Sequence, residues 1–224
     1  MNLIRLLLSL AVLTALVPNA RAGEPNLVLN PSFEDDTAWT SRQHPGWHRF
    51  ELTPKRPHSG RRCAQTVLEK HPVTEGAQIW GALQEFKVSK LPRKIGVWYR
   101  IENWKQATGK QYVQVVVMIH DKRLEKLTTQ PQMQVRYILA GLSEPPYPNP
   151  VNGRYLMAGP KKPRQGRWVH FERNLVDDFV KAWGWYPENF QRMEIFLEAR
   201  YDEPVPEGIK VTGEVYWDDA ILMP

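Results

Sequence analysis

The stretch that most constrains this chain lies near its carboxyl terminus, where residues 215–222 read VYWDDAIL. Apolar side chains flank a pair of carboxylates there, and the chain ends two residues later, which predicts a last strand that closes a β-sheet. Neighbouring side chains on a strand point to opposite faces, so only one of Asp218 and Asp219 can face the core. The alternation predicts that Asp218 faces inward with Tyr216, Ala220 and Leu222, and that Asp219 faces outward with Trp217 and Ile221.

The other end carries a second informative stretch, in which residues 26–35 read NLVLNPSFED. It is predicted to be a short strand followed by a turn through Asn-Pro-Ser. The two ends together resemble the galactose-binding-like β-sandwich family, in particular the carbohydrate-binding modules of secreted glycoside hydrolases. Members begin with a phrase like N-L-x-x-N-x-S-F-E and end with aromatic-x-D-D/N-V-x-L, and here Ala220 stands where Val is usual. Residues 59–67 and 166–171 also resemble family strands, whereas residues 103–166 depart from the family pattern.

This resemblance implies a structural calcium ion between the two ends, because many such modules hold one there. The candidate metal ligands are Glu34 and Asp218, since hard oxygen ligands suit Ca²⁺. A carboxylate aimed at a core is costly unless a cation or hydrogen-bond donors neutralise it. Arginine side chains or backbone N–H groups are therefore the alternative partners of these two carboxylates.

Residues 1–22 have the layout of a cleaved secretory signal. Arg5 precedes an apolar run over residues 6–17, Pro18 breaks the run, and Ala-Arg-Ala stands before Gly23. The run is too short to span a bilayer with ease. We therefore expect a soluble exported protein, secreted or periplasmic, with no membrane span and with residues 23–224 forming a single β-sandwich domain.

Charge and cysteine content narrow the classes further. The signal removes two arginines, so the formal net charge falls from +6 to +4. No Lys/Arg block with interleaved aromatic residues is present, so nucleic-acid binding is not expected, while a mild preference for anionic glycans fits the charge. The single Cys63 cannot form an internal disulfide and is expected to be buried.

Composition and periodicity favour strands. Proline (19 residues) and tryptophan (9) are abundant, and helix-period stripes are nearly absent. Asn174 is predicted to cap one short helix over residues 175–183, with Gly184 after its end. Residues 141–163 hold six prolines and are predicted to be a long ordered loop. Further strands are predicted at residues 61–67, 77–86 with a bulge at Gly81, 93–102, 111–120, 133–139, 166–172 and 192–201. The expected fold is an all-β jelly-roll β-sandwich, galactose-binding-domain-like, with one short helix and long loops.

Aromatic residues provide the candidate ligand-binding site. Sugars expose C–H groups on which Trp or Tyr rings stack, while polar neighbours bind the hydroxyls. Nine tryptophans exceed what one core of this size requires, so at least one exposed aromatic platform is expected. The candidates, each of which could instead serve packing, are Trp80, Trp98, Arg100, Trp104, Tyr155, Trp183 and Trp185.

Catalytic motifs are missing from the sequence, including HExxH, a Gly-rich phosphate loop and GxSxG. His170 and Glu172 stand two apart on one predicted strand and could transfer a proton, but they also fit a plain exposed face. Glu194 and Glu198 share a face, yet four residues of strand separate them by about 13 Å, more than either glycosidase geometry needs. We therefore expect no enzyme.

The expected function is that of a non-catalytic, carbohydrate-binding module-like exported protein, which binds polysaccharide or glycan as a monomer. Two alternatives stay open. One is a hydrolase or lyase active on polysaccharide, and the other is an envelope scaffold or adhesion domain that binds protein.

Overall fold

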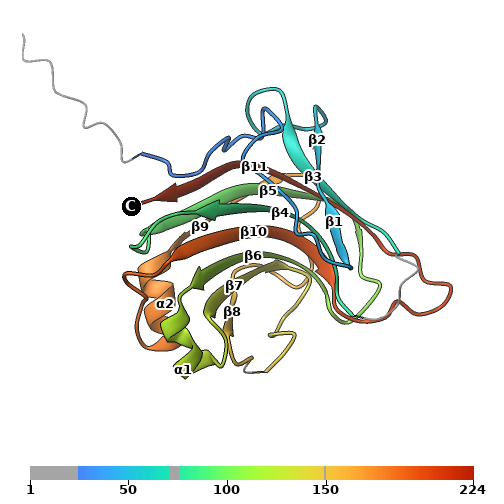
Figure 1. Cartoon of the computed structure of the whole chain (residues 1–224). Helices are drawn as coiled ribbons and strands as arrows, with labels where there is room; N and C mark the ends of the chain where they lie inside the picture. The colour runs from blue at the N-terminus through green and yellow to red at the C-terminus, as the bar shows by residue number, and fades with distance from the viewer. Residues whose placement is uncertain (1–24, 71–75, 149) are drawn as a thin grey trace, which may run out of the picture.

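The computed structural model describes residues 25–70, 76–148 and 150–224, so the predicted signal over residues 1–22 lies outside the described residues. The described chain forms two packed β-sheets, whose arched strands are drawn in Figure 1. The strand order of the six-stranded sheet A is β1 (Trp47–Arg49), β4 (Gln78–Phe86), β10 (Arg192–Tyr201), β6 (Gln111–His120), β7 (Gln132–Ala140) and β8 (Gly153–Met157). The order of the five-stranded sheet B is β2 (Glu51–Thr53), β3 (Cys63–Leu68), β11 (Thr212–Met223), β5 (Lys94–Lys105) and β9 (Trp168–Asn174).

Strand pairing is antiparallel except at two places in sheet A, where β1 pairs with β4 and β7 pairs with β8 in parallel. The core lies between the sheets and follows the alternation of the strands. Val113, Val115 and Val117 of β6 point into it, and Val97 of β5 does so from the other sheet. Fully burying such a side chain stabilises the fold by about 1.5–3 kcal/mol. The predicted all-β sandwich is confirmed.

Helices make up only a small part of the fold. The predicted helix is α2 (Leu175–Trp183), in which the Asn174 side chain accepts a hydrogen bond from the backbone N–H of Asp177. Gly184 ends it in the left-handed conformation at φ +82°, which glycine adopts without strain. The expectation of one short helix was incomplete, because the 3₁₀ turn η1 (Lys122–Leu124) and the single-turn helix α1 (Glu125–Thr128) follow β6. Their residues lack a helix-length apolar stripe and gave no sequence signal.

The two ends of the described chain lie side by side. The Leu27 N–H donates to the Leu222 carbonyl at 2.8 Å, and the Ala220 N–H donates to the Pro31 carbonyl at 2.9 Å. The Asn26 side chain extends this contact, donating to the Ala220 carbonyl and accepting from the Leu222 N–H. The predicted strand over residues 26–29 was nevertheless wrong, because these few bonds form no regular ladder.

The closing strand β11 differs from its predicted alternation. Trp217 is fully buried in the main core, whereas Tyr216 lies on the other side of the sheet, against Gln65 and Glu214. The pairing of β11 with β5 shifts between Asp218 and Ile221, and Asp219 has φ +46°. This β-bulge returns Ala220 and Leu222 to the core face, because an extra residue reverses the alternation beyond it.

Two further expectations need correction. Gly81 is not a bulge, since β4 pairs with β10 in unbroken register; a Cβ there would lie 2.7 Å from the Leu197 carbonyl oxygen, so the sheet requires a glycine. The loop over residues 141–163 is interrupted by β8, which occupies its proline-free part as an edge strand. In the part of the chain that the structure describes, no helix is long and apolar enough to cross a membrane.

Candidate functional site

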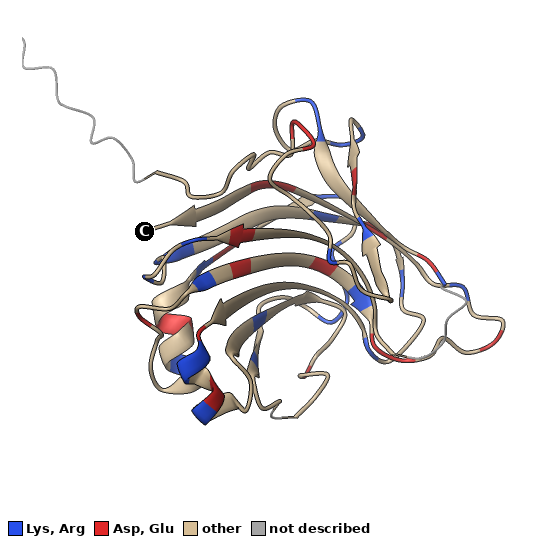
Figure 2. Ribbon diagram, in the orientation of Figure 1, with Lys and Arg blue, Asp and Glu red and all other residues tan. Residues whose placement is uncertain are grey.

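The outer face of sheet A, which points away from the core, carries polar side chains that are unexpectedly buried. Gln114 of β6 is 0% exposed, and Glu194 and Glu198 of β10 are 6% and 4% exposed. The outer face of a sheet normally meets water, so burial of charged and amide groups there indicates a built polar surface rather than a solvated one. Figure 2 shows that the acidic residues of β10 lie between basic ones on the same strand.

Gln114 and Glu198 line a groove of about 190 Å³ across the five neighbouring strands β1, β4, β10, β6 and β7, with Arg42 at one side, and Glu194 lies beside it. We call it the sheet A groove. Its lining comprises Arg42, Trp47, Ile79, Gln114, Val116, Met118, Gln132, Gln134, Arg136, Phe196, Glu198 and Arg200. The strand register explains the grouping, since Phe196 lies opposite Val116, and Val116 lies opposite Arg136.

A chain of hydrogen bonds runs along the floor of the groove. The Gln114 amide donates from Nε2 to Glu198 Oε2 at 2.5 Å, and Arg200 Nη1 donates to the same oxygen at 3.0 Å. Arg200 continues to Asp202, whose other carboxylate oxygen accepts from the Tyr112 hydroxyl at 2.6 Å. Burial lowers the pKa of the Arg200 guanidinium, but Tyr112 and the carboxylates of Asp202 and Glu198 outweigh it and hold the pKa above its ordinary value.

Gln114 is left with one unsatisfied group. Its Oε1 is buried and has no hydrogen-bond partner among the described residues. The amide cannot be turned over to remove this problem, because the Glu198 carboxylate accepts from it and so requires the N–H₂ end. A buried acceptor without a donor costs about 1–3 kcal/mol, and such an atom beneath a groove is satisfied by a donor from outside the chain, either an ordered water or a ligand group.

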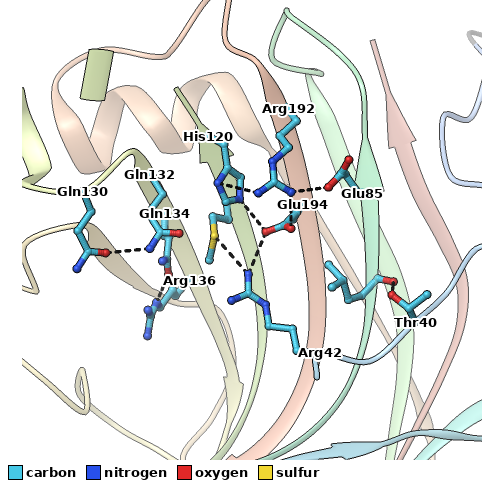
Figure 3. A network of polar contacts seen from close by, with 12 residues as sticks. Thr40, Arg42, Glu85, His120, Gln130, Gln132, Gln134, Arg136, Arg192 and Glu194 are labelled. Carbon is cyan, nitrogen blue, oxygen red and sulfur yellow. Dashed lines mark hydrogen bonds and ion pairs between the residues drawn. The ribbon is translucent and has the colours of Figure 1, made fainter. Parts of the chain in front are cut away.

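A second polar cluster, shown in Figure 3, surrounds Glu194. Its carboxylate accepts from Arg42 Nη2 at 3.1 Å, from Arg192 Nη1 at 2.9 Å and from His120 Nε2 at 2.7 Å. Burial raises the pKa of Glu194, but the His120 hydrogen bond and the nearby positive charges outweigh it and hold the pKa below the ordinary value. Glu194 is therefore an ionised anchor, and Arg192 also pairs with Glu85.

Apolar surface is present beside these charges. The Arg42 guanidinium lies 4.7 Å from the centroid of the Phe196 ring, and Trp47 tilts against the same ring with centroids 5.8 Å apart. Val116 and Met118 complete this small apolar cluster on the outer face. The groove thus combines aromatic and aliphatic surface with amides and charges, which is the composition of a site for a polar ligand with C–H faces.

The predicted aromatic residues do not come together. Trp98 and Arg100 share the outer face of sheet B, where the Trp98 ring is stacked between His58 and His170, at centroid distances of 4.0 and 4.7 Å. Both faces of this ring are thus covered by other rings. Arg100 is held by Glu102 at 2.6 Å.

The other predicted residues are scattered. Trp80 and Trp104 are buried in the core cluster. Trp183 of α2 donates from its indole to the Gln134 carbonyl at 3.2 Å, and Trp185 is 40% exposed beyond the same helix. Only Tyr155 lies beside the sheet A groove, where its hydroxyl accepts from Arg136. Ligand binding by these residues as one site stays a prediction that the structure does not test.

The two predicted metal ligands, Glu34 and Asp218, face hydrogen-bond donors. Glu34 Oε1 accepts from the backbone N–H groups of Arg61 and Arg62, at 2.7 and 3.1 Å. Asp218 Oδ2 accepts from the N–H groups of His58 and Ser59, also at 2.7 and 3.1 Å. Oxygens that accept from backbone N–H donors in this way match the backbone alternative.

Among the residues that the structure describes, no group of three or more His, Cys, Asp and Glu side chains is arranged to hold a metal. Calcium binding at Glu34 and Asp218 stays a prediction. The single Cys63 is buried as expected, and burial raises the pKa of its thiol to about 12.

The described residues form a two-sheet β-sandwich with a polar groove on the outer face of sheet A. No protein-family model matches the chain, and no curated protein matches it. Solved structures of carbohydrate-binding modules do match. TmCBM61, in complex with β-1,4-galactotriose, has 12% identity over 89% of this chain and 98% of that chain, with a TM-score of 0.44.

Two further carbohydrate-binding modules match over similar lengths. A family 16 carbohydrate-binding module-2 has 16% identity over 89% of this chain and 100% of that chain, with a TM-score of 0.46. The non-crystalline cellulose specific module CBM28 has 12% identity over 90% and 97% of the two chains, with a TM-score of 0.48. The predicted likeness to carbohydrate-binding β-sandwiches is confirmed, and at these identities it concerns the fold alone.

Sequence reasoning missed the sheet A groove. Val116 and Met118 make the outer face of β6 resemble a second core face, and both faces of this strand are indeed buried. Glu194 and Glu198 were considered only as a catalytic pair. The sequence did contain one signal, which is that polar residues stand at alternate positions of three strands. These residues are Gln114 in β6, Gln134 and Arg136 in β7, and Glu198 and Arg200 in β10.

Proposed function

We propose that this protein binds a glycan in the sheet A groove and catalyses no reaction on it. The observation that carries the proposal is the buried, unsatisfied Oε1 of Gln114 in a groove lined by amides, charges and aromatic rings. A sugar hydroxyl is a donor of the required kind, and the neighbouring carboxylates and guanidinium groups suit the other hydroxyls. Trp47, which is partly exposed and packs against the buried Phe196 ring, provides apolar surface for C–H groups.

The absence of catalysis is proposed from the state of the groove carboxylates. Glu194 and Glu198 are engaged by arginine side chains at 3.1 and 3.0 Å. A general acid of a glycosidase must hold a proton near neutral pH, whereas the pKa of Glu194 lies below its ordinary value. Export is proposed from residues 1–22 alone, whose pattern is that of a secretory signal.

Binding can be tested with a panel of soluble neutral and acidic polysaccharides, using affinity electrophoresis and then calorimetry on the best ligand. The informative variant is Gln114→Met, which keeps the size of the side chain but removes its polar end. We expect the dissociation constant to rise about ten-fold, because a hydrogen bond in a desolvated site contributes about 1.4 kcal/mol or more.

The matched control is Gln65→Met. Gln65 is also buried on an outer sheet face, but on sheet B, where its amide bonds Glu214 and Tyr216. Its replacement should leave glycan affinity unchanged. Silence of the unmodified protein across the panel, or equal loss of affinity in the two variants, would remove the groove from the proposal.

A further inference from the structure

Four arginines belong to the sheet A groove or to the Glu194 cluster beside it, and three of them are neutralised. Arg42 pairs with Glu194, Arg192 with Glu194 and Glu85, and Arg200 with Glu198 and Asp202. The fourth, Arg136 on β7, has no carboxylate within 4.0 Å among the described residues. This difference divides the groove into a charge-balanced side on β10 and a positive side on β7.

The contacts of Arg136 are neutral. Its Nε donates to Gln134 Oε1 at 2.7 Å, as Figure 3 shows, and its Nη1 donates to the Tyr155 hydroxyl at 3.1 Å. The guanidinium also lies over the Tyr155 ring, 5.4 Å from the centroid. Gly153 of the neighbouring strand β8 packs close to the Arg136 guanidinium. A Cβ added at that glycine would lie 3.4 Å from Arg136 Nε.

These contacts orient the guanidinium without neutralising it. Arg136 is half-buried, so part of its hydration is lost, and a half-desolvated cation gains most from an anionic acceptor. The guanidinium is a planar fork of N–H donors, and a carboxylate presents two oxygens that match such a fork. The ring and amide around Arg136 restrict its rotation, which lowers the entropy cost of binding that acceptor.

We propose that the sheet A groove takes an acidic glycan and that Arg136 binds the carboxylate of a uronic acid residue in it. This rests on the proposed glycan binding. Gln114 lies on the neighbouring strand, diagonal to Arg136, since Arg136 is opposite Val116. Diagonal neighbours of a sheet are about 7–8 Å apart, so the carboxylate at Arg136 and a hydroxyl at Gln114 belong to one short segment of the same glycan.

The test compares each of several uronic acid polymers with its own carboxyl-reduced form, which keeps the backbone and removes the charge. A sulfated neutral polymer is the third ligand. We expect the uronate polymer to bind at least ten-fold more tightly than its reduced form. In Arg136→Gln this preference should disappear, while Arg136→Lys should keep part of it because the positive charge remains.

The control variant is Arg167→Gln, which replaces an exposed arginine directly before β9 in the other sheet and should leave the preference unchanged. Circular dichroism and melting would establish that each variant is folded. Equal binding of a polymer and its reduced form would overturn the inference while leaving glycan binding intact, as would binding of the sulfated polymer alone. Silence toward every polymer would overturn glycan binding as well.

Discussion

Asp218 is fully buried where the pairing of β11 with β5 shifts. Its alternation with Tyr216 was expected to place it in the core, whereas it lies under the loop that contains His58 and Ser59 and accepts their N–H groups. A third bond comes from the N–H of Asp219. The carboxylate therefore organises a turn through three backbone N–H donors.

Replacing Asp218 by asparagine should destabilise the protein by about 1–3 kcal/mol at neutral pH, because the amide has one acceptor atom fewer and leaves backbone N–H donors unsatisfied. The measurement is urea unfolding with a chelator present, so that no metal contributes. Asp36→Asn, at an exposed site, is the control. A loss below about 0.5 kcal/mol would contradict this role.

The same residue predicts a pH dependence. Burial, aided by the charge of Asp219, raises the pKa of Asp218 to about 6 despite its backbone hydrogen bonds. A raised folded-state pKa means that the native protein binds the proton more tightly than the unfolded chain does. Stability from this group is thus present below its ordinary value of 3.8 and is lost as the pH rises to about 6.

The difference in unfolding free energy between the unmodified protein and Asp218→Asn should therefore shrink from pH 4 to pH 6.5. Parallel stability curves over this range would show that the pKa of Asp218 is not raised.

Among the elements, the helix α2 was predictable residue by residue because its signals are local. Asn174 caps it, Asp177 and Asp178 occupy its first turn, and Gly184 ends it. We expect Asn174→Ala to cost about 1 kcal/mol, since the N–H of Asp177 loses its acceptor. Asn174→Asp keeps an acceptor and should unfold at nearly the urea concentration of the unmodified protein. Equal destabilisation by both would assign the effect to something other than the cap.

Strands were predictable where apolar and polar residues alternate regularly. Features that depend on which strands pair with each other were less predictable. The strand β10 was predicted from sequence because apolar residues stand at alternate positions, at Met193, Ile195 and Leu197, and these residues lie in the core. The groove was not identified, because it depends on which strands become neighbours. Glu198 meets Gln114 across 84 residues of chain, and no local pattern encodes that register. The β-bulge at Asp219 was not predicted either, because it also depends on the register between paired strands.

At the scale of the whole molecule, the contact between the two ends was predicted from sequence motifs. The loop that joins the ends was not predicted. Glu34 near one end and Asp218 near the other each accept N–H groups from the same loop, over residues 58–62. The loop therefore joins the ends through backbone hydrogen bonds. Sequence alone left this arrangement and a calcium ion as alternatives, because both satisfy a carboxylate.

The two sheets also divide the aromatic residues in a way that composition could not reveal. Several predicted tryptophans fill the core, and Trp98 is enclosed between two histidine rings on sheet B. The sheet A groove instead combines Trp47 with polar side chains. The central claim about function is therefore that the ligand binds at the outer face of sheet A and not at the outer face of sheet B.

The most direct test is a titration of isotope-labelled protein with the tightest-binding oligosaccharide, followed by side-chain amide and indole resonances. Binding in the sheet A groove predicts that the signals of Gln114, Gln134 and the Trp47 indole shift together, while the Trp98 indole stays in place. Shifts confined to Trp98 and its neighbours on sheet B would contradict the assignment of the groove.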